Sequence, residues 1–190
     1  SCGWFHRASA EDFSKIPGNP IAYWVTPKFR NVFAENQSLG EIGNARLGMA
    51  TGGNDTYLRL WSEVSDQKIG RSYSNRNDAK ASNRKWFPYN KGGPFRRWYG
   101  NNFYLVNWEN DGKLLQTTMH PDGKRIWAHN FNLNYIFKKC LTFTATSSSF
   151  FGVRYSADGF LFDNKGSSYF CDEKRLLPIL GLLASNPATK

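Results

Sequence analysis

Cysteine and histidine are scarce in this sequence, and their spacing excludes the common metal and disulfide frameworks. The three cysteines are Cys2, Cys140 and Cys171. They are odd in number and far apart, with no CxxC pair, so they indicate a reducing cytoplasm and no zinc site. The three histidines are His6, His120 and His129. They are equally scattered, and we interpret them as solvated loop residues.

Long apolar runs are also missing. No stretch reaches the roughly 18 apolar residues that a membrane-spanning helix needs. The first seven residues lack a charged segment followed by an apolar one, so they do not indicate a signal peptide. We therefore expect a cytoplasmic protein without a membrane partner.

Acidic residues are outnumbered. The chain has 190 residues, enough for one domain with a core, and carries 25 Lys and Arg against 15 Asp and Glu. The net charge of +10 favours a polyanionic partner such as double-stranded DNA. The alternative is that the charge only aids solubility.

One stretch, residues 79–108, has no acidic residue at all. It contains six basic residues and nine aromatic ones, interleaved with glycines and asparagines. Arginine and asparagine can read guanine and adenine edges, lysine neutralises phosphates, and rings stack on bases. We expect Trp86, Phe87 and Trp108 to be core residues. The candidate DNA contacts here are Arg84, Lys85, Asn90, Lys91, Gly92, Gly93, Arg96, Arg97, Trp98, Tyr99, Asn101 and Asn102.

A second candidate loop is Thr51-Gly-Gly-Asn54. It lacks the GxxxxGK[ST] and GxGxxG patterns, so a nucleotide site is not indicated. We interpret Thr51 and Asn54 as part of a DNA-facing loop, with a plain turn as the alternative.

The periodicity predicts an α+β fold with strands in the middle and helices at the ends. Thr26 and Pro27 predict the cap and first residue of a helix that ends near residue 35 or 36. Residues 39–47 read as strand or turn. Strands are expected at residues 57–64, 86–89, 103–108, 141–145, 151–155 and 160–163. Residues 57–64 alternate as a half-buried strand, with Leu58, Leu60 and Val64 on the inner face.

Turns and caps complete the secondary-structure prediction. Asp158-Gly159 predicts a hairpin between the last two strands. Asn77 or Asp78 could cap a short helix over residues 77–83, and Asp111 another over residues 112–118. Pro178 should not lie deep in a helix, so the C-terminal helix is expected to start near Leu177.

Catalytic motifs are missing. The sequence has no Asn/Asp-Pro-Pro-Tyr/Phe motif and no glycine-rich loop for S-adenosylmethionine. A nuclease would need clustered carboxylates with a lysine, and the nearest approach is Asp158 and Asp163 with Lys165. We expect no catalytic residues, no metal and no cofactor in this chain.

Several strings resemble the region after the catalytic domain in BREX-type adenine-specific DNA methyltransferases. These are phage-defence enzymes related to Type II restriction–modification methylases that fuse modification with recognition. The strings are PGNPIAYW (17–24), LGEI (39–42), TGGN (51–54), KWFPYNKGGPFRRWYGNN (85–102), VNWENDG (106–112), RYS (154–156), GFLFD (159–163), GSS (166–168) and LGLLAS (180–185).

The resemblance implies a target-recognition domain for duplex DNA, built as a mixed, twisted, barrel-like β structure with a C-terminal helix. It adds Arg154, Ser167 and Ser168 to the candidate DNA contacts. Residues 1–37 would connect from an absent catalytic domain, which would bind S-adenosylmethionine, and residues 38–190 would recognise DNA. Other defence-system subunits are further possible partners.

Three departures from the family pattern stand out. Gly53 replaces a frequent Asp, Pro178 interrupts a helix that is usually smooth, and residues 120–134 match poorly. Because variable stretches of recognition domains carry specificity, the resemblance implies that residues 120–134 could read bases. A protein-interaction domain within a defence complex is the alternative function.

Overall fold

The computed structural model describes residues 8–148 and 150–185. Cys2 and His6 lie outside these residues. The chain divides into two compact units, one up to Ile42 and one from Gly43 onward. The predicted division after residue 37 separates a connecting segment from a DNA-recognition domain by function, and it stays a prediction. No helix in the described ranges is both long and apolar enough to span a bilayer.

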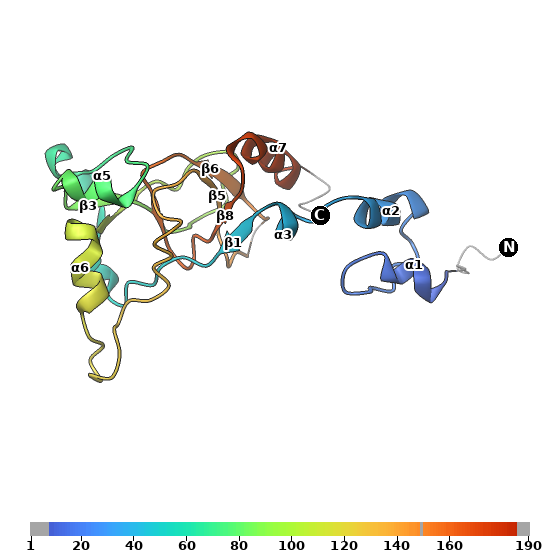
Figure 1. The fold of residues 1–190 in the computed structure, drawn as a ribbon, viewed down its shortest axis with the longest axis horizontal. Coiled ribbons are helices and arrows are strands. Elements are labelled where there is room, and N and C mark those ends of the chain that lie inside the picture. The colour runs from blue at the N-terminus through green and yellow to red at the C-terminus, as the bar shows by residue number, and fades with distance from the viewer. Residues whose placement is uncertain (1–7, 149, 186–190) are drawn as a thin grey trace. The chain divides into compact units, whose positions relative to one another are not determined.

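The first unit contains three short helices, α1 (Ala10–Ser14), α2 (Pro27–Glu35) and α3 (Leu39–Ile42) (Figure 1). The predicted start of α2 is confirmed, because the Thr26 hydroxyl accepts a hydrogen bond from the Phe29 N–H at 3.3 Å and Pro27 occupies the first turn. Residues 39–47 hold α3 and then strand β1 (Asn44–Arg46), which begins the second unit.

The second unit contains two four-stranded sheets. The first sheet has the order β1, β8 (Ser168–Phe170), β5 (Cys140–Phe143) and β6 (Val153–Ser156), all antiparallel. The second sheet has the order β2 (Leu58–Leu60), β4 (Tyr104–Asn107), β3 (Trp86–Asn90) and β7 (Leu161–Phe162). The predicted α+β class is confirmed. The described strands form two four-stranded sheets and no closed barrel.

The chain passes from one sheet to the other between β6 and β7. β6 pairs with β5, whereas β7 pairs in parallel with β3. The predicted hairpin at Asp158-Gly159 is therefore wrong, and this turn is the crossover between sheets. Gly159 has φ +95°, and a Cβ there would lie 2.6 Å from the Ser72 nitrogen. The turn is glycine because it passes directly over another backbone.

The main core lies where large side chains from both sheets meet. Its most buried large members include Trp108, Tyr89, Phe87 and Phe137. Trp86, Phe87 and Trp108 are all buried, as predicted. Burial of side chains of this size stabilises a fold by about 1.5–3 kcal/mol each.

The remaining helices are α4 (Asn54–Tyr57), α5 (Arg76–Ala81), α6 (Glu109–Thr117), α7 (Glu173–Leu183) and the 3₁₀ helices η1 (Trp61–Glu63) and η2 (Asp66–Lys68). The half-buried strand expected over residues 57–64 is reduced to β2. Glu63 accepts a hydrogen bond from the Leu60 N–H at 2.6 Å, which turns the chain into η1 and leaves Leu60 exposed.

Two predicted helix caps and one predicted helix start are wrong. Asn75, rather than Asn77 or Asp78, caps α5 by accepting from the Asp78 N–H at 2.9 Å. Asp111 adopts φ +61°, and its carboxylate instead binds the Arg76 guanidinium and the Trp108 indole N–H.

The C-terminal helix starts earlier than predicted. α7 begins at Glu173, so Pro178 lies inside it. Asp172 caps α7. Pro178 has no N–H to donate within the helix, and burial of Leu176, Ile179 and Leu180 offsets the loss of that hydrogen bond.

Candidate nucleic-acid interface

The acid-free stretch of the sequence folds as two buried strands joined by a long exposed connection. β3 and β4 pair antiparallel, and residues 91–103 link them. We call this connection the 91–103 loop. Glycine, tryptophan and asparagine residues with positive φ give it an irregular path: Gly92, Gly93, Trp98, Gly100 and Asn101. The loop therefore holds its shape through specific contacts and not through regular secondary structure.

Those contacts attach the 91–103 loop to the edge of the first sheet. The Trp98 N–H donates to the Val153 carbonyl at 3.0 Å, and the Tyr155 N–H donates to the Trp98 carbonyl at 2.9 Å. The Asn101 amide donates to the Pro94 carbonyl at 2.9 Å, which closes the loop on itself. Because the peptide bonds on both sides of Trp98 are fixed to β6, the position of its side chain is set by the sheet.

The outer side of the loop presents rings and arginines to solvent. Trp98 is 53% exposed and Tyr99 68%, and Arg96 beside them is also exposed. Trp61 adds a further exposed ring. Its backbone N–H donates to the Phe103 carbonyl at 2.9 Å, which places Trp61 beside the end of the loop. We call this set the ring-and-arginine surface; its members are Trp61, Arg96, Arg97, Trp98, Tyr99 and Phe103.

The two arginines of this surface differ in exposure, since Arg96 is exposed and Arg97 is half-buried with its Nε enclosed. Neither Arg96 nor Arg97 forms an ion pair with any described residue. Arg97 lies over the Phe95 ring at 5.5 Å, and Arg96 donates only to the adjacent Phe95 carbonyl. Trp61 and Phe103 were not among the predicted contacts. Both lie in segments that the sequence predicts as strands, and they meet where the β2–β4 pairing, with Leu60 opposite Tyr104, continues into the backbone bond between them.

Lys91, unlike Arg96 and Arg97, forms an ion pair within the protein. Its ammonium lies 3.3 Å from the buried Asp163 carboxylate, which also accepts from the Tyr89 hydroxyl at 3.1 Å. Burial and then the Asp163 charge raise the pKa of Tyr89, so this phenol stays neutral. The charge of Lys91 is thus balanced within the protein. A phosphate at this position would have to compete with Asp163.

Many of the other predicted contacts are buried. The buried ones are Thr51, Asn90, Gly92, Asn101, Arg154, Ser167 and Ser168. The Asn90 amide donates to the Ser156 hydroxyl at 2.8 Å, and Gly92 lies against Lys165 and Gly166. The structure therefore brings the start of the 91–103 loop next to the 166–168 segment.

Arg154 is the most unusual of the buried residues. The residue is 1% exposed, and its guanidinium donates a long hydrogen bond of 3.4 Å to the Gly152 carbonyl. Burial lowers its pKa. Its backbone neighbours, Val153 and Tyr155, are the residues that hold Trp98. Arg154 is thus placed to support the loop from below.

The second predicted loop lies beside Lys91. The Thr51 hydroxyl donates to the Asn54 side-chain oxygen at 2.8 Å, and exposed Asn54 begins α4. Asn54 and Lys91 line one hollow of about 490 Å³, together with Arg59 and Tyr104. Arg84 and Lys85 are elsewhere, since they precede β3 whereas the loop follows it. Lys85 there faces Glu109 at 3.9 Å.

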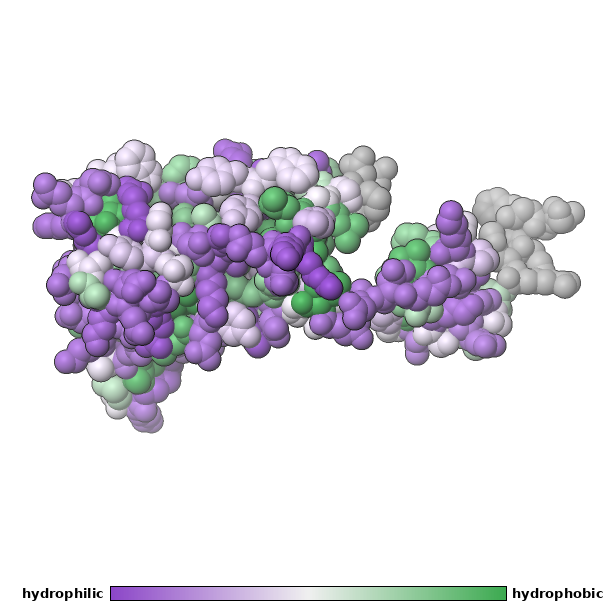
Figure 2. All heavy atoms as spheres, turned by 45° about the horizontal axis from the view of Figure 1, so that its top comes forward, coloured by the Kyte–Doolittle hydropathy of each residue, from purple (hydrophilic) through white to green (hydrophobic). Residues whose placement is uncertain are grey.

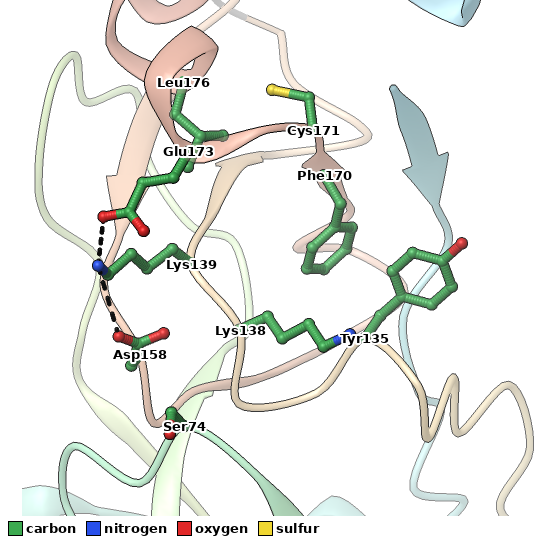
Figure 3. A pocket seen from close by; sticks show the side chains of 9 residues that line it. All are labelled: Ser74, Tyr135, Lys138, Lys139, Asp158, Phe170, Cys171, Glu173 and Leu176. Carbon is green, nitrogen blue, oxygen red and sulfur yellow. Dashed lines mark hydrogen bonds and ion pairs between the residues drawn. The ribbon is translucent and has the colours of Figure 1, made fainter. Parts of the chain in front are cut away.

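A further pocket, of about 510 Å³, is lined by Phe170 of β8, by Glu173 and Leu176 of α7, and by loop residues that include Lys138 and Lys139 (Figure 3). Figure 3 shows Lys139 between the carboxylates of Glu173 and Asp158, and its nitrogen is 3.8 Å from the latter. The Glu173 carboxylate raises the pKa of Lys139. Asp158 is thus engaged by Lys139 and Asp163 by Lys91. Over residues 8–148 and 150–185, no three His, Cys, Asp or Glu side chains gather as a metal site would require.

Comparison with known proteins gives two relatives of much greater length. The chain is 42% identical over 188 residues to the adenine-specific methyltransferase PglX of Lacticaseibacillus casei (strain Zhang), covering 98% of this chain and 16% of that protein. It is 40% identical over 182 residues to the adenine-specific methyltransferase BrxX of Escherichia coli O9:H4 (strain HS), covering 95% of this chain and 14% of that protein. No family model matches. The expected resemblance is confirmed, and it is to a small region of larger methyltransferases.

Proposed function

We propose that this chain is the DNA target-recognition part of a larger adenine-specific DNA methyltransferase of a phage-defence or restriction–modification system. The ring-and-arginine surface would contact duplex DNA. The observation that carries the proposal is the 91–103 loop. It presents unpaired arginines and exposed rings from a backbone bonded to a sheet.

Charge and chemistry agree with this role. The chain has a net charge of +10, and Figure 2 shows that the larger unit presents a mostly hydrophilic surface in that view. Arginine serves both phosphates and guanine edges, and tryptophan or tyrosine can stack on a base or wedge a step. Asn54, Asn102, Arg84 and Lys85 remain proposed contacts. Buried Asn90, Asn101, Arg154, Ser167 and Ser168 would position the loop.

The chemistry itself would belong to the rest of such a protein. A catalytic domain would supply S-adenosylmethionine binding and methyl transfer, and we assign neither to residues of this chain. Duplex DNA and that catalytic domain would be the principal partners, and a cytoplasmic location would follow from these partners.

The test is salt-dependent duplex binding by the 190-residue chain. We expect Arg96→Ala with Arg97→Ala to weaken binding to all duplexes and to reduce the slope of log K against log salt by about 2. Lys174→Ala with Arg175→Ala removes the same charge from α7 and should leave the slope unchanged. Absence of duplex binding at low salt, or binding that ignores Arg96 and Arg97, would reject the proposal.

A second candidate function is a protein-interaction domain in a defence complex. The first unit favours it, because six large apolar side chains there are 43–71% exposed: Ile21, Tyr23, Trp24, Phe29, Val32 and Phe33. Three of them, Phe29, Val32 and Phe33, have the spacing of one face of α2. Co-purification with other subunits that survives charge reversal at Arg96 and Arg97, while duplex binding is lost, would favour this function.

A further inference from the structure

Residues 118–129 form a short hairpin, held by one β-bridge, that projects from the second unit beyond α6 (Figure 1). The Trp127 N–H donates to the Thr118 carbonyl at 2.9 Å, and the His120 N–H donates to the Arg125 carbonyl at 2.8 Å. Met119 and Ile126 pair between these bonds. We call this segment the 118–129 ribbon. It falls within the stretch that matched the methyltransferase pattern poorly.

The tip of the ribbon is a closed turn. The Gly123 N–H donates to the His120 carbonyl at 2.8 Å, with Pro121 in the second position and Gly123 at φ +68°. The Asp122 carboxylate accepts from the Lys124 N–H at 2.9 Å. The His120 Nδ1 lies 3.2 Å from the Asp122 backbone nitrogen and 3.0 Å from the Asp122 carboxylate, so the His120 ring lies against the turn.

The base of the ribbon is fixed to the rest of the unit. Ala50 and His129 exchange two backbone hydrogen bonds of 3.1 Å each. The Trp127 ring covers Gly52, where a Cβ would lie 2.4 Å from the ring, and the His120 ring meets Trp127 edge-on at 5.8 Å. Met49, next to Ala50, donates its N–H to the Phe162 carbonyl of β7 at 2.8 Å. The ribbon is therefore a braced projection.

The chemistry of its surface is that of a groove-reading element. Residues 121–126 are all exposed, and Lys124 and Arg125 follow the turn. Neither cation has an ion pair among the described residues. Met119 is 48% and Ile126 42% exposed. The tip of the projection is hydrophilic in Figure 2, with apolar residues behind it.

We propose that the 118–129 ribbon enters the major groove of duplex DNA and carries sequence discrimination, with Arg125 on a guanine edge and Lys124 on a phosphate. This rests on the proposed function and adds the element that reads bases. The major groove admits a two-stranded ribbon, and arginine binds the guanine O6 and N7 together. Met119 and Ile126 would contact apolar groups such as thymine methyls. The ring-and-arginine surface would supply affinity that is independent of sequence.

The test is selection of binding sites from a random duplex library. It compares the wild-type chain, Arg125→Lys, Lys124→Ala with Arg125→Ala, and Lys174→Ala with Arg175→Ala. The last pair is a matched control, because it is another exposed Lys-Arg dipeptide, on α7. Arg125→Lys keeps the charge but loses the planar two-bond geometry. It should reduce discrimination at one guanine about tenfold or more, while affinity for unrelated duplexes is retained.

The other variants separate the two proposals. The double ribbon variant should still bind duplexes in a salt-dependent way while selecting a shorter or no motif, and the α7 control should select the wild-type motif. Wild-type binding with a motif that the ribbon variants leave unchanged overturns the ribbon inference alone. Wild-type binding with no motif at all overturns both the ribbon inference and the target-recognition role. A wild-type chain that binds no duplex overturns the proposed function with it. Thermal unfolding of each variant checks that the fold is retained.

Discussion

Single residues decide how the candidate interface is built, and Gly52 is the clearest case. It has φ +79°, and a Cβ there would lie 2.4 Å from Trp127. Gly52→Ala should therefore destabilise the unit by about 2–4 kcal/mol, from backbone strain together with displacement of the ring. Gly123→Ala is the control for strain alone, since Gly123 also has positive φ but no atom within 4 Å. Chemical denaturation measures both, and equal losses would mean that the Trp127 contact contributes nothing.

Cys140 gives a prediction about pH. It is fully enclosed, and burial raises its pKa from 9.0 to about 11. A raised folded-state pKa means that the stabilising contribution is complete below pH 9 and is lost as pH rises toward 11. Unfolding free energy should therefore fall by about 3 kcal/mol across that window. Cys140→Ala should remove the part of this slope that comes from the thiol. An unchanged slope in the variant would assign it to other groups, such as Tyr89.

At the scale of elements, prediction succeeded where the signal is local. The start of α2 follows from Thr26 and Pro27 alone, and the strands β3 and β4 follow from runs of aromatic and branched residues. It failed where a distant partner decides. Asp111 was expected to cap a helix, but Arg76, 35 positions away in sequence, binds its carboxylate. Similarly, Asp158-Gly159 reads as a hairpin because its strands give no sign of belonging to different sheets.

The candidate site shows the same division. The 91–103 loop could be predicted from composition, since its rings, glycines and arginines are visible without a structure. It could not separate exposed Arg96 from Lys91, because the neutralising Asp163 comes 72 residues later. Nor could it show that Trp61 joins Phe103, or that Trp127 ties the 118–129 ribbon to Gly52. Both of these contacts require the tertiary fold.

For the molecule as a whole, the question is how a short chain relates to long relatives. The chain spans about 14–16% of the length of PglX and BrxX, whereas nearly all of it is matched. Both units therefore have counterparts in these methyltransferases. Under the proposed function, this chain would recognise DNA and a separate part of the larger protein would carry out catalysis. That division of labour can be tested by exchange.

We expect a chimera, in which this chain replaces the matched region of BrxX, to methylate adenine within a motif that follows this chain. The physical reason is that base contacts would come from the 118–129 ribbon and phosphate contacts from the 91–103 loop, both of which travel with the exchange. The motif should match the one that the 190-residue chain selects by itself, and the chain alone should transfer no methyl group. Sequencing of modified adenines in host DNA gives the readout.

A chimera that still methylates the original BrxX motif would place recognition outside this region. An inactive chimera would be checked with the converse exchange, and the same Arg125→Lys substitution in an active one should relax the motif at a single guanine.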